Sequence, residues 1–188
     1  ELVAVINGAQ YLRRLNSLGN EIWFDGEKVT GQLSKFWAFK GLLETKASLY
    51  DLQVSPKLID EMTYISPSSQ ELVSLSYLQP KSLEDLRKRR KMMEHWARHT
   101  NGILGRSPDY LNSVLMSFAS STYLLNGKDH CYPGHLLTYY ELAREQDLSL
   151  THTFISPQVN RSPFYVEKPD LEEPIAAKII GETKAGLI

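Results

Sequence analysis

The chain has 188 residues, of which 42% are hydrophobic and 23% are charged, proportions typical of a globular protein with a solid core. Its formal net charge of −1 gives no general attraction to nucleic acid or to an anionic membrane, and no apolar run approaches the about 20 residues of a membrane span. The single cysteine, Cys131, excludes an internal disulfide and fits a cytoplasmic location.

Neither end of the sequence has the character of a natural terminus. The chain begins with Glu1 rather than methionine, without the basic flank of a signal peptide, and it ends in the largely apolar residues 184–188. We therefore expect the chain to be the front portion of a longer protein, in which later residues complete any site.

The first half of the chain carries the local signals of two helices and a tight turn. Asn7 has the side chain to cap a helix start, and Asp25-Gly26 supplies the positive φ angles of a hairpin turn. Apolar residues at helical spacing, among them Phe36 and Phe39, predict a longer second helix. The elements expected here are a helix, a hairpin, a helix and an extended or looped stretch, over residues 7–18, 21–30, 32–52 and 62–78.

Three helices with stronger signals follow. Ser82 with Asp85 three residues later is typical of a helix start, and Asn101-Gly102 is a stop signal. Ser107 as a cap, with Pro108 in the first helical position, predicts the start of the next helix. Its expected buried stripe consists of Leu111, Val114, Leu115, Phe118, Thr122 and Leu125. The three helices are expected over residues 82–102, 107–127 and 132–146.

The composition changes after Asp147 from helical to strand-like, with a proline-containing loop in between. Strands are expected over residues 148–156, 175–181 and 185–188. The sequence therefore predicts a mainly α fold with a β portion. A helical domain over residues 1–147, including the small hairpin, is followed by the truncated beginning of a β domain over residues 148–188.

A guanidinium and a phenol lie at the predicted start of the helix near residue 107. Arg106 comes immediately before that start, and Tyr110 falls in the first turn. A guanidinium is permanently charged and a helix N-terminus adds a partial positive charge, so together they favour an anion such as a phenolate. The alternative is a structural role, in which Arg106 pairs with a neighbouring carboxylate and Tyr110 is a core residue.

His152 and the polar loop after it form a second group of candidates. In a strand, His152 lies on the same face as Leu150 and Phe154, where it either makes a structural hydrogen bond or handles a proton. The loop has amide, guanidinium and backbone donors that suit a flavin or its pyrophosphate, or else it is a plain turn. Its candidate residues are Gln158, Val159, Asn160 and Arg161.

Other motifs are weaker. His95 and His99 share a helix face but lack a third ligand, so no metal site is predicted. The basic residues 87–91 are typical of a solvated helix face. The sequence contains no glycine-rich nucleotide loop, which argues against a Rossmann nucleotide site in this chain.

Three motifs in combination, at residues 105–110, 151–152 and 157–162, resemble those of the oxygenase component of the two-component, FAD-dependent 4-hydroxyphenylacetate 3-monooxygenases. The resemblance extends over the whole chain, from residues 7–12 to residues 181–188. It implies an acyl-CoA-dehydrogenase-like fold, with a helical N-terminal domain and the start of a β-barrel middle domain. It also implies a homo-oligomer, usually a tetramer.

The chemistry that this resemblance implies is ortho-hydroxylation of a phenol such as 4-hydroxyphenylacetate, in the breakdown of aromatic compounds. FADH2 comes from a separate NAD(P)H-flavin reductase and reacts with O2 to a C4a-hydroperoxide, whose distal oxygen is transferred to the ring. By the resemblance, Arg106 stabilises the phenolate, Tyr110 orients the hydroxyl, and His152 hydrogen-bonds it or relays its proton. The loop that contacts FAD in the family matches Gln158, Val159, Asn160 and Arg161.

Three alternatives accompany this hypothesis. A related flavin hydroxylase of a chlorophenol or of a siderophore-chromophore precursor would have similar motifs. A 4-hydroxybutyryl-CoA dehydratase shares the scaffold but needs an iron–sulfur cluster, and the lone Cys131 cannot supply its ligands. From a different class, the chain is a non-catalytic interaction module that binds through the basic helix starting at Ser82.

Overall fold

The computed structural model describes residues 5–104, 108–127, 131–151, 182–183 and 186–187. The chain divides into two compact units, Glu1–Leu150 and Thr151–Ile188. In the second unit the described residues form one antiparallel pair, β5 (Glu182–Thr183) with β6 (Gly186–Leu187). β6 falls within the strand expected over residues 185–188, whereas the strand expected over residues 175–181 lies outside the described residues.

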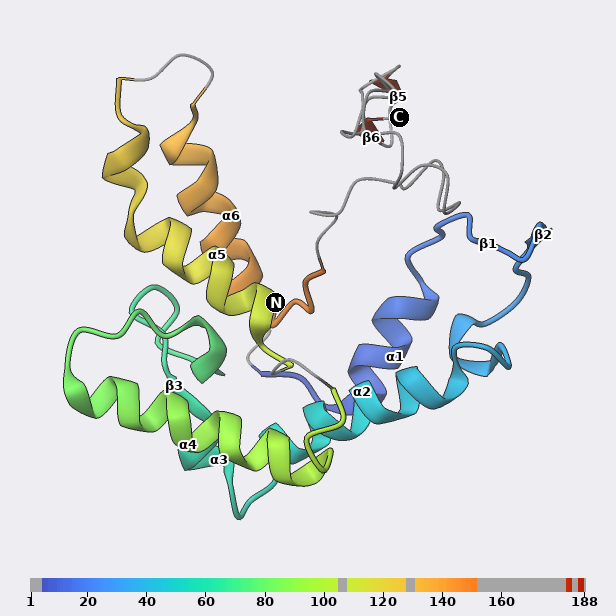
Figure 1. Ribbon diagram of the computed structural model, residues 1–188, viewed down its shortest axis with the longest axis horizontal. Helices are drawn as coiled ribbons and strands as arrows, with labels where there is room; N and C mark the ends of the chain where they lie inside the picture. Colours follow the sequence, from blue (N-terminus) through green and yellow to red (C-terminus); the bar gives the residue numbers. More distant parts are fainter. Residues whose placement is uncertain (1–4, 105–107, 128–130, 152–181, 184–185, 188) are drawn as a thin grey trace, which may run out of the picture. The chain divides into compact units, whose positions relative to one another are not determined.

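The described part of the first unit is mainly helical, with two short hairpins (Figure 1). Its elements in chain order, where η marks a 3-10 helix, are α1 (Gly8–Asn16), β1 (Trp23–Phe24), β2 (Glu27–Lys28), η1 (Leu33–Lys35), α2 (Lys40–Gln53), α3 (Ile59–Met62), β3 (Thr63–Ile65), β4 (Leu72–Ser74), η2 (Leu75–Tyr77), α4 (Leu83–His99), α5 (Tyr110–Ser120), η3 (Thr122–Leu125) and α6 (Pro133–Glu145).

Helix α1 begins where the sequence predicts and packs closely on α2. The Asn7 side chain accepts from the backbone of Gln10 at 2.9 Å, and the Gln10 side chain accepts from the backbone of Asn7 at 2.8 Å. The Gly8 amide donates to Asp51 of α2 at 2.8 Å. A Cβ atom on Gly8 would lie 2.4 Å from the Ala47 carbonyl oxygen, so this contact between helices requires glycine.

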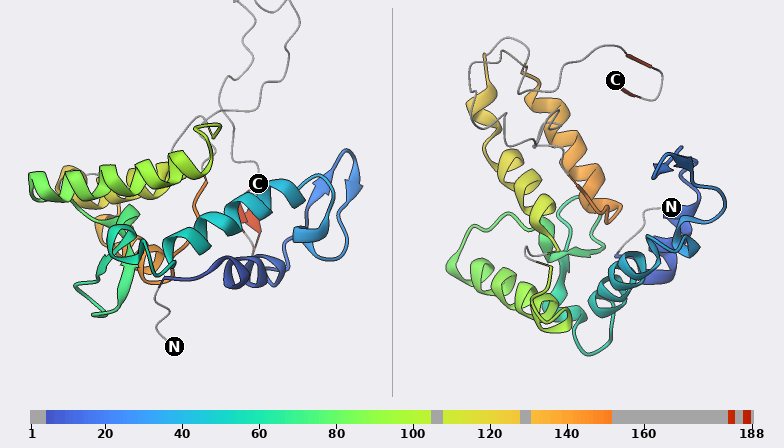
Figure 2. Two further views of the ribbon diagram at one scale, coloured as in Figure 1. Left: turned by 90° about the horizontal axis from the view of Figure 1, so that it is seen from below. Right: turned by 45° about the vertical axis from the view of Figure 1, so that its right-hand side comes forward.

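The hairpin expected over residues 21–30 is present, whereas the helix after it begins later than predicted. Asp25 and Gly26 have φ angles of 51° and 79° at the turn between β1 and β2, which appear as blue arrows in the left view of Figure 2. The expectation of a helix from residue 32 is wrong, because α2 starts at Lys40. Phe36 and Phe39 instead pack edge-on or tilted against Phe24 and each other ahead of the helix.

The stretch expected to be extended or looped contains a small antiparallel hairpin. Strand β3 pairs with β4 in the register Thr63↔Ser74, Tyr64↔Val73 and Ile65↔Leu72. The chain then turns through η2, where Leu75 and Tyr77 are both buried. Leu75 belongs to one core cluster and Tyr77 to the other, so this short segment joins them.

The two core clusters lie on either side of η2. The first is formed by residues of α2, α3, η2 and α4, namely Leu49, Met62, Leu75, Met92 and Trp96. The second is formed by residues of η2, α5 and α6, namely Tyr77, Leu115, Met116, Ala119, Tyr140 and Ala143. Helices α5 and α6 lie side by side in Figure 1 and in the right view of Figure 2, in agreement with their shared cluster.

The prediction for α5 needs two corrections. The helix does not begin with Ser107 and Pro108: Pro108 lies in a turn and the first helical residue is Tyr110. Asp109 precedes it with φ −90° and ψ 8°, and its carboxylate binds other side chains instead of capping the helix. Phe118 is 55% exposed, because the buried face turns toward Leu115, Met116 and Ala119.

Helices α4 and α6 agree with their predicted ranges, and both end on a residue in the left-handed region. Asn101 has a φ of 52° after α4, and Asp147 has a φ of 49° after α6. The Leu148 amide donates to the Ala143 carbonyl at 3.0 Å and so completes the end of α6. Residues 148–151 therefore lack the strand that was expected to start there, and residues 152–156 lie outside the described residues.

No helix in the part of the chain that the structure describes has the length and apolar character needed to cross a bilayer.

Candidate functional site

Of the predicted site residues, the structure describes Tyr110 alone. It is the first residue of α5, and its side chain is 37% exposed. The preceding residue, Asp109, is fully buried. The remaining predicted residues lie outside the described residues: Arg106, His152, Gln158, Val159, Asn160 and Arg161.

Asp109 is bound by an arginine from another helix. Arg89 of α4 lies 3.3 Å from the Asp109 carboxylate through Nη2, and the same nitrogen donates to the Ser113 hydroxyl at 2.5 Å. Ser113 in turn donates to the Asp109 carboxylate at 2.7 Å. These three side chains therefore bind one another at the start of α5, where Arg89 and Asp109 are buried and Ser113 is partly buried.

The other terminal nitrogen of Arg89 binds the segment around η2. Nη1 donates to the carbonyl oxygens of Leu75 and Ser76 at 2.7 Å and of Leu78 at 3.3 Å. Burial lowers the pKa of Arg89, and the nearby Asp109 carboxylate opposes that shift. The guanidinium thus connects α4, η2 and α5 at a single point.

The sequence prediction missed Arg89. Residues 87–91 are exposed, as a solvated basic face requires, except for Arg89, which is only 6% exposed. The sequence signal that could have identified Arg89 is its spacing, because it lies three residues before Met92 and seven before Trp96, which are both buried. This spacing places Arg89 on the apolar face of the helix.

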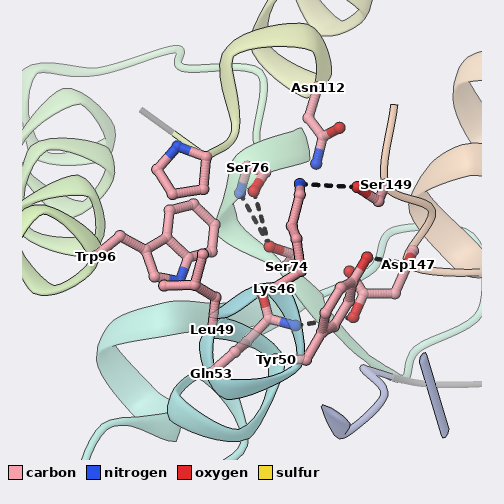
Figure 3. Close-up of a pocket in the computed structure, with 11 residues that line it drawn as sticks. Lys46, Leu49, Tyr50, Gln53, Ser74, Ser76, Trp96, Asn112, Asp147 and Ser149 are labelled. Atoms are coloured by element: carbon pink, nitrogen blue, oxygen red, sulfur yellow. Dashed lines mark hydrogen bonds between the residues drawn. The ribbon is translucent and has the colours of Figure 1, made fainter. Parts of the chain in front are cut away.

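A small cavity has Pro108, from the predicted phenol-binding segment, among its lining residues (Figure 3). Its volume is about 30 Å³, and its lining combines apolar and polar side chains: Lys46, Leu49, Tyr50, Gln53, Ser74, Ser76, Trp96, Pro108, Asn112, Asp147 and Ser149. Among the described residues, the Trp96 indole nitrogen is the one buried side-chain polar atom without a hydrogen-bond partner. A space of this size with such groups has room for about one or two water molecules.

This cavity does not fit a flavin. A ligand of that kind requires a pocket of roughly 300 Å³ or more, far above the volume of this cavity. The predicted flavin loop lies outside the described residues.

Asp147 is a buried carboxylate beside the same cavity. Its Oδ2 accepts from the Ile6 backbone at 3.1 Å and from the Gln53 side chain at 2.8 Å. Burial raises the pKa of Asp147 to about 6, and these two hydrogen bonds oppose the shift. Asp147 thereby ties the segment before α1, helix α2 and the end of α6 together.

Among the described residues, no group of three or more possible ligands could hold a metal ion. His95 contacts the Glu61 carboxylate, and His99 lies 2.9 Å from the Ser48 hydroxyl. Both histidines thus have local structural partners.

Comparisons with known proteins identify the family. The family described as 4-hydroxyphenylacetate 3-hydroxylase N terminal matches residues 7–188. Because this match covers almost the whole sequence, the chain belongs to that family. The resemblance inferred from the three motifs is confirmed, and the mainly helical structure with small sheets agrees with the expectation of a mainly α fold with a β portion.

Several relatives are similar over nearly all of the chain. It is 56% identical, over 99% of its length, to the "Probable 4-hydroxyphenylacetate 3-monooxygenase" of Bacillus subtilis (strain 168), of which it covers 38%. It is 35% identical, over 96% of its length, to the 4-hydroxyphenylacetate 3-monooxygenase oxygenase component of Geobacillus sp. (strain PA-9), of which it covers 36%.

A solved structure gives the same result. A crystal structure of the oxygenase component of 4-hydroxyphenylacetate 3-monooxygenase, complexed with FAD and 4-hydroxyphenylacetate, matches with a TM-score of 0.77 and 34% identity. The match covers 97% of this chain and 36% of that chain. The chain thus spans a little over a third of the length of these relatives.

Proposed function

We propose that this chain is the N-terminal portion of the oxygenase component of a two-component, FAD-dependent aromatic monooxygenase. The observation that carries the proposal is the likeness, over 97% of the chain, to an oxygenase component whose crystal structure contains FAD and 4-hydroxyphenylacetate. The proposed substrate is a phenol such as 4-hydroxyphenylacetate, and the proposed reaction is hydroxylation of its ring with O2.

The proposal includes the architecture and partners implied by the resemblance. Residues 1–147 form the helical N-terminal domain of an acyl-CoA-dehydrogenase-like fold, and residues 148–188 begin its middle β domain. An NAD(P)H-flavin reductase supplies the reduced flavin, because an oxygenase component by its nature works with a second component. The complete protein is a cytoplasmic homo-oligomer, and a tetramer is the proposed state.

Bound reduced FAD would supply the activation of dioxygen, and the side chains of the chain act on the phenol. Arg106 holds the phenol oxygen in a charged or strongly hydrogen-bonded form, which raises the electron density at the ortho carbon. Tyr110 orients the hydroxyl from the first turn of α5, and its partly exposed side chain is compatible with this role. His152 accepts or relays the phenol proton.

The flavin is held, in this proposal, by the loop residues Gln158, Val159, Asn160 and Arg161 together with residues beyond the chain. The cavity of about 30 Å³ that Pro108 helps to line has room for water and not for the flavin.

The identity of the phenol is itself a proposal, because the chain is also similar to monooxygenases with other names. The chain is 28% identical to the 4-nitrophenol 2-monooxygenase oxygenase component of Rhodococcus sp and 31% identical to the FADH(2)-dependent monooxygenase TftD of Burkholderia cepacia. A test of function therefore compares 4-hydroxyphenylacetate with 4-nitrophenol and a chlorophenol.

The test combines the full-length protein with a flavin reductase, NADH and FAD, and measures hydroxylated product and hydrogen peroxide by chromatography and a peroxidase assay. Arg106→Ala should lower product per flavin oxidised at least tenfold while flavin oxidation continues and peroxide rises. Arg90→Ala, which removes an exposed arginine of α4, is the matched control and should retain product. Absence of hydroxylated product from every phenol with the unmodified protein would overturn the proposal.

A further inference from the structure

We propose that Arg89 is a positioning residue, which fixes the start of α5 and thereby the placement of Tyr110 against the phenol. This inference rests on the proposed function and assigns a role to a side chain outside the motif of residues 105–110. Arg89 acts through Asp109 and Ser113, because its side chain is buried and both terminal nitrogens are occupied by protein groups.

The first step of the argument is that the guanidinium itself is fixed. Nη1 is bound by three backbone carbonyls around η2, and backbone groups that are buried between the two core clusters are held in place. A planar guanidinium that is fixed at one nitrogen has a defined direction at the other. The N–H groups of Nη2 therefore have a fixed position and direction, and Asp109 and Ser113 accept hydrogen bonds from them there.

The second step is that these two partners define the first turn of α5. Asp109 and Ser113 are four residues apart and share one helix face. Their side chains are joined by a 2.7 Å hydrogen bond, and the Ser113 amide donates to the Asp109 carbonyl at 2.8 Å. Contact with Arg89 at both positions fixes the rotation of this turn as well as its place along the helix axis.

The third step is the consequence for the proposed phenol-binding groups. Tyr110 follows Asp109 directly, about 100° further around the helix, so rotation of the first turn redirects its phenol. Arg106 precedes Asp109 by three residues, which limits the separation of their Cα atoms to about 11 Å. The side chains of Arg89, Asp109 and Ser113 therefore provide a fixed point at Asp109, which lies within three residues of both Arg106 and Tyr110 along the chain.

The fourth step separates positioning from general support of the fold. Arg144 of α6 is also a buried arginine, with 4% exposure. It donates to Glu145 at 2.7 Å and to Ser68 at 2.8 Å, and none of its hydrogen bonds in the described structure reaches α5. The two arginines are thus matched in burial and differ in what they hold.

The experiment compares Arg89→Lys with Arg144→Lys in the full-length protein, at temperatures equally far below each variant's Tm. We expect Arg89→Lys to lower product per flavin oxidised at least fivefold and to raise the KM for the phenol, with flavin oxidation continuing. Arg144→Lys should stay within twofold of the unmodified protein in both quantities.

A spectroscopic measurement provides a readout that general destabilisation does not move. 4-Nitrophenol absorbs differently as phenol and phenolate, so its bound pKa can be titrated without turnover. We expect the unmodified protein to lower that pKa on binding, and Arg89→Lys to reverse most of the shift. Ser113→Ala, which removes one contact and leaves the Arg89–Asp109 pair, should reverse part of it.

The outcomes distinguish this inference from the proposed function. If the unmodified protein hydroxylates a phenol and Arg89→Lys behaves like Arg144→Lys, the positioning role is wrong and the function stands. If the unmodified protein hydroxylates no phenol, both fail. Should Arg89→Lys not fold, Ser113→Ala decides, and an unchanged KM and product yield in that variant overturn the inference.

Discussion

Arg89 of α4 and Asp109 at the start of α5 form a buried ion pair across twenty residues of sequence, with 3.3 Å between Nη2 and Oδ2. The side chains are 7% and 0% exposed. Two charges taken out of water are stable together only when hydrogen bonds satisfy their remaining polar atoms. Ser113 and three backbone carbonyls provide such bonds here.

This pair predicts a strong coupling in stability. Arg89→Met should lower the free energy of unfolding by about 3–5 kcal/mol, because it removes the guanidinium from a buried ion pair and leaves the Asp109 carboxylate in place. Asp109→Asn should lower the free energy of unfolding much less in the Arg89→Met background than in the unmodified chain. Urea unfolding of the four proteins, followed by circular dichroism, measures the cycle. Additive effects within about 0.5 kcal/mol would contradict the coupling.

The close packing of α1 on α2 predicts that alanine is destabilising at Gly8 but not at a glycine with open space around it. Gly8→Ala should destabilise the chain by about 1–3 kcal/mol, because its Cβ would lie 2.4 Å from the Ala47 carbonyl oxygen. Gly134→Ala in α6 is the control, since nothing lies within 4 Å of its Cβ position. Alanine there should be neutral or stabilising by up to about 1 kcal/mol. Equal Tm values for the two variants would show that α1 and α2 can move apart without a measurable loss of stability.

Asp147 predicts a pH-dependent stability with a defined sign. Below about pH 4 its carboxyl is protonated in both the folded and the unfolded chain and has no differential effect. Between pH 4 and the folded pKa of about 6, the unfolded chain releases its proton first, so the folded state loses stability. Above pH 6 this loss is complete, on the order of 3 kcal/mol.

Asp147→Asn tests that sign. Asparagine tolerates the φ of 49° and keeps an oxygen for Ile6 and Gln53. The variant should match the unmodified chain at pH 4 and be more stable at pH 7.5, as measured by urea unfolding. Glu71→Gln, at an exposed carboxylate, is the control for the removal of one negative charge. A difference for Asp147→Asn that does not grow with pH would rule out a buried, ionised carboxylate.

The proposed flavin site is made partly of residues of this chain and partly of residues beyond it. The chain alone is therefore predicted to bind FAD weakly. The 188-residue chain should bind FAD poorly in a fluorescence titration, because most of the flavin contacts are proposed to lie beyond it. The full-length protein is the positive control. Saturable binding in the micromolar range by the chain alone would place the flavin site within these 188 residues.

The elements that the sequence predicts well are those set by neighbouring residues. The Asn7 and Ser82 caps and the Asp25-Gly26 turn each depend on groups within a few positions, and all three are present. The start of α5 was misplaced because Asp109 is committed to Arg89, which lies on another helix. A local pattern contains no information on such a partner.

The candidate site shows the same limit. The motif of residues 105–110 pointed to the family, which the comparisons confirm, but Arg89 was assigned to a solvated basic face. Its position on the apolar side of α4 was visible in the spacing to Met92 and Trp96. What the arginine binds there depends on η2 and α5, and only the folded chain brings these elements together.

The role proposed for His152 predicts a pH dependence of hydroxylation. If the imidazole accepts the phenol proton, the rate should rise as the ring loses its own proton, between roughly pH 5 and 8. His152→Asn keeps some hydrogen bonding but removes this titration, so the profile should flatten and product per flavin oxidised should fall. The measurement is product yield and rate in the full-length protein across this pH range.

A second histidine provides the matched control for that experiment. His135 lies on α6, where it is exposed and stacks on Tyr132 with 5.3 Å between ring centres. His135→Asn should leave both the pH profile and the yield unchanged, because an exposed imidazole at this position has no proposed contact with the phenol. A profile for His152→Asn that coincides with that of His135→Asn would reduce His152 to a packing residue and leave Arg106 and Tyr110 to bind the hydroxyl.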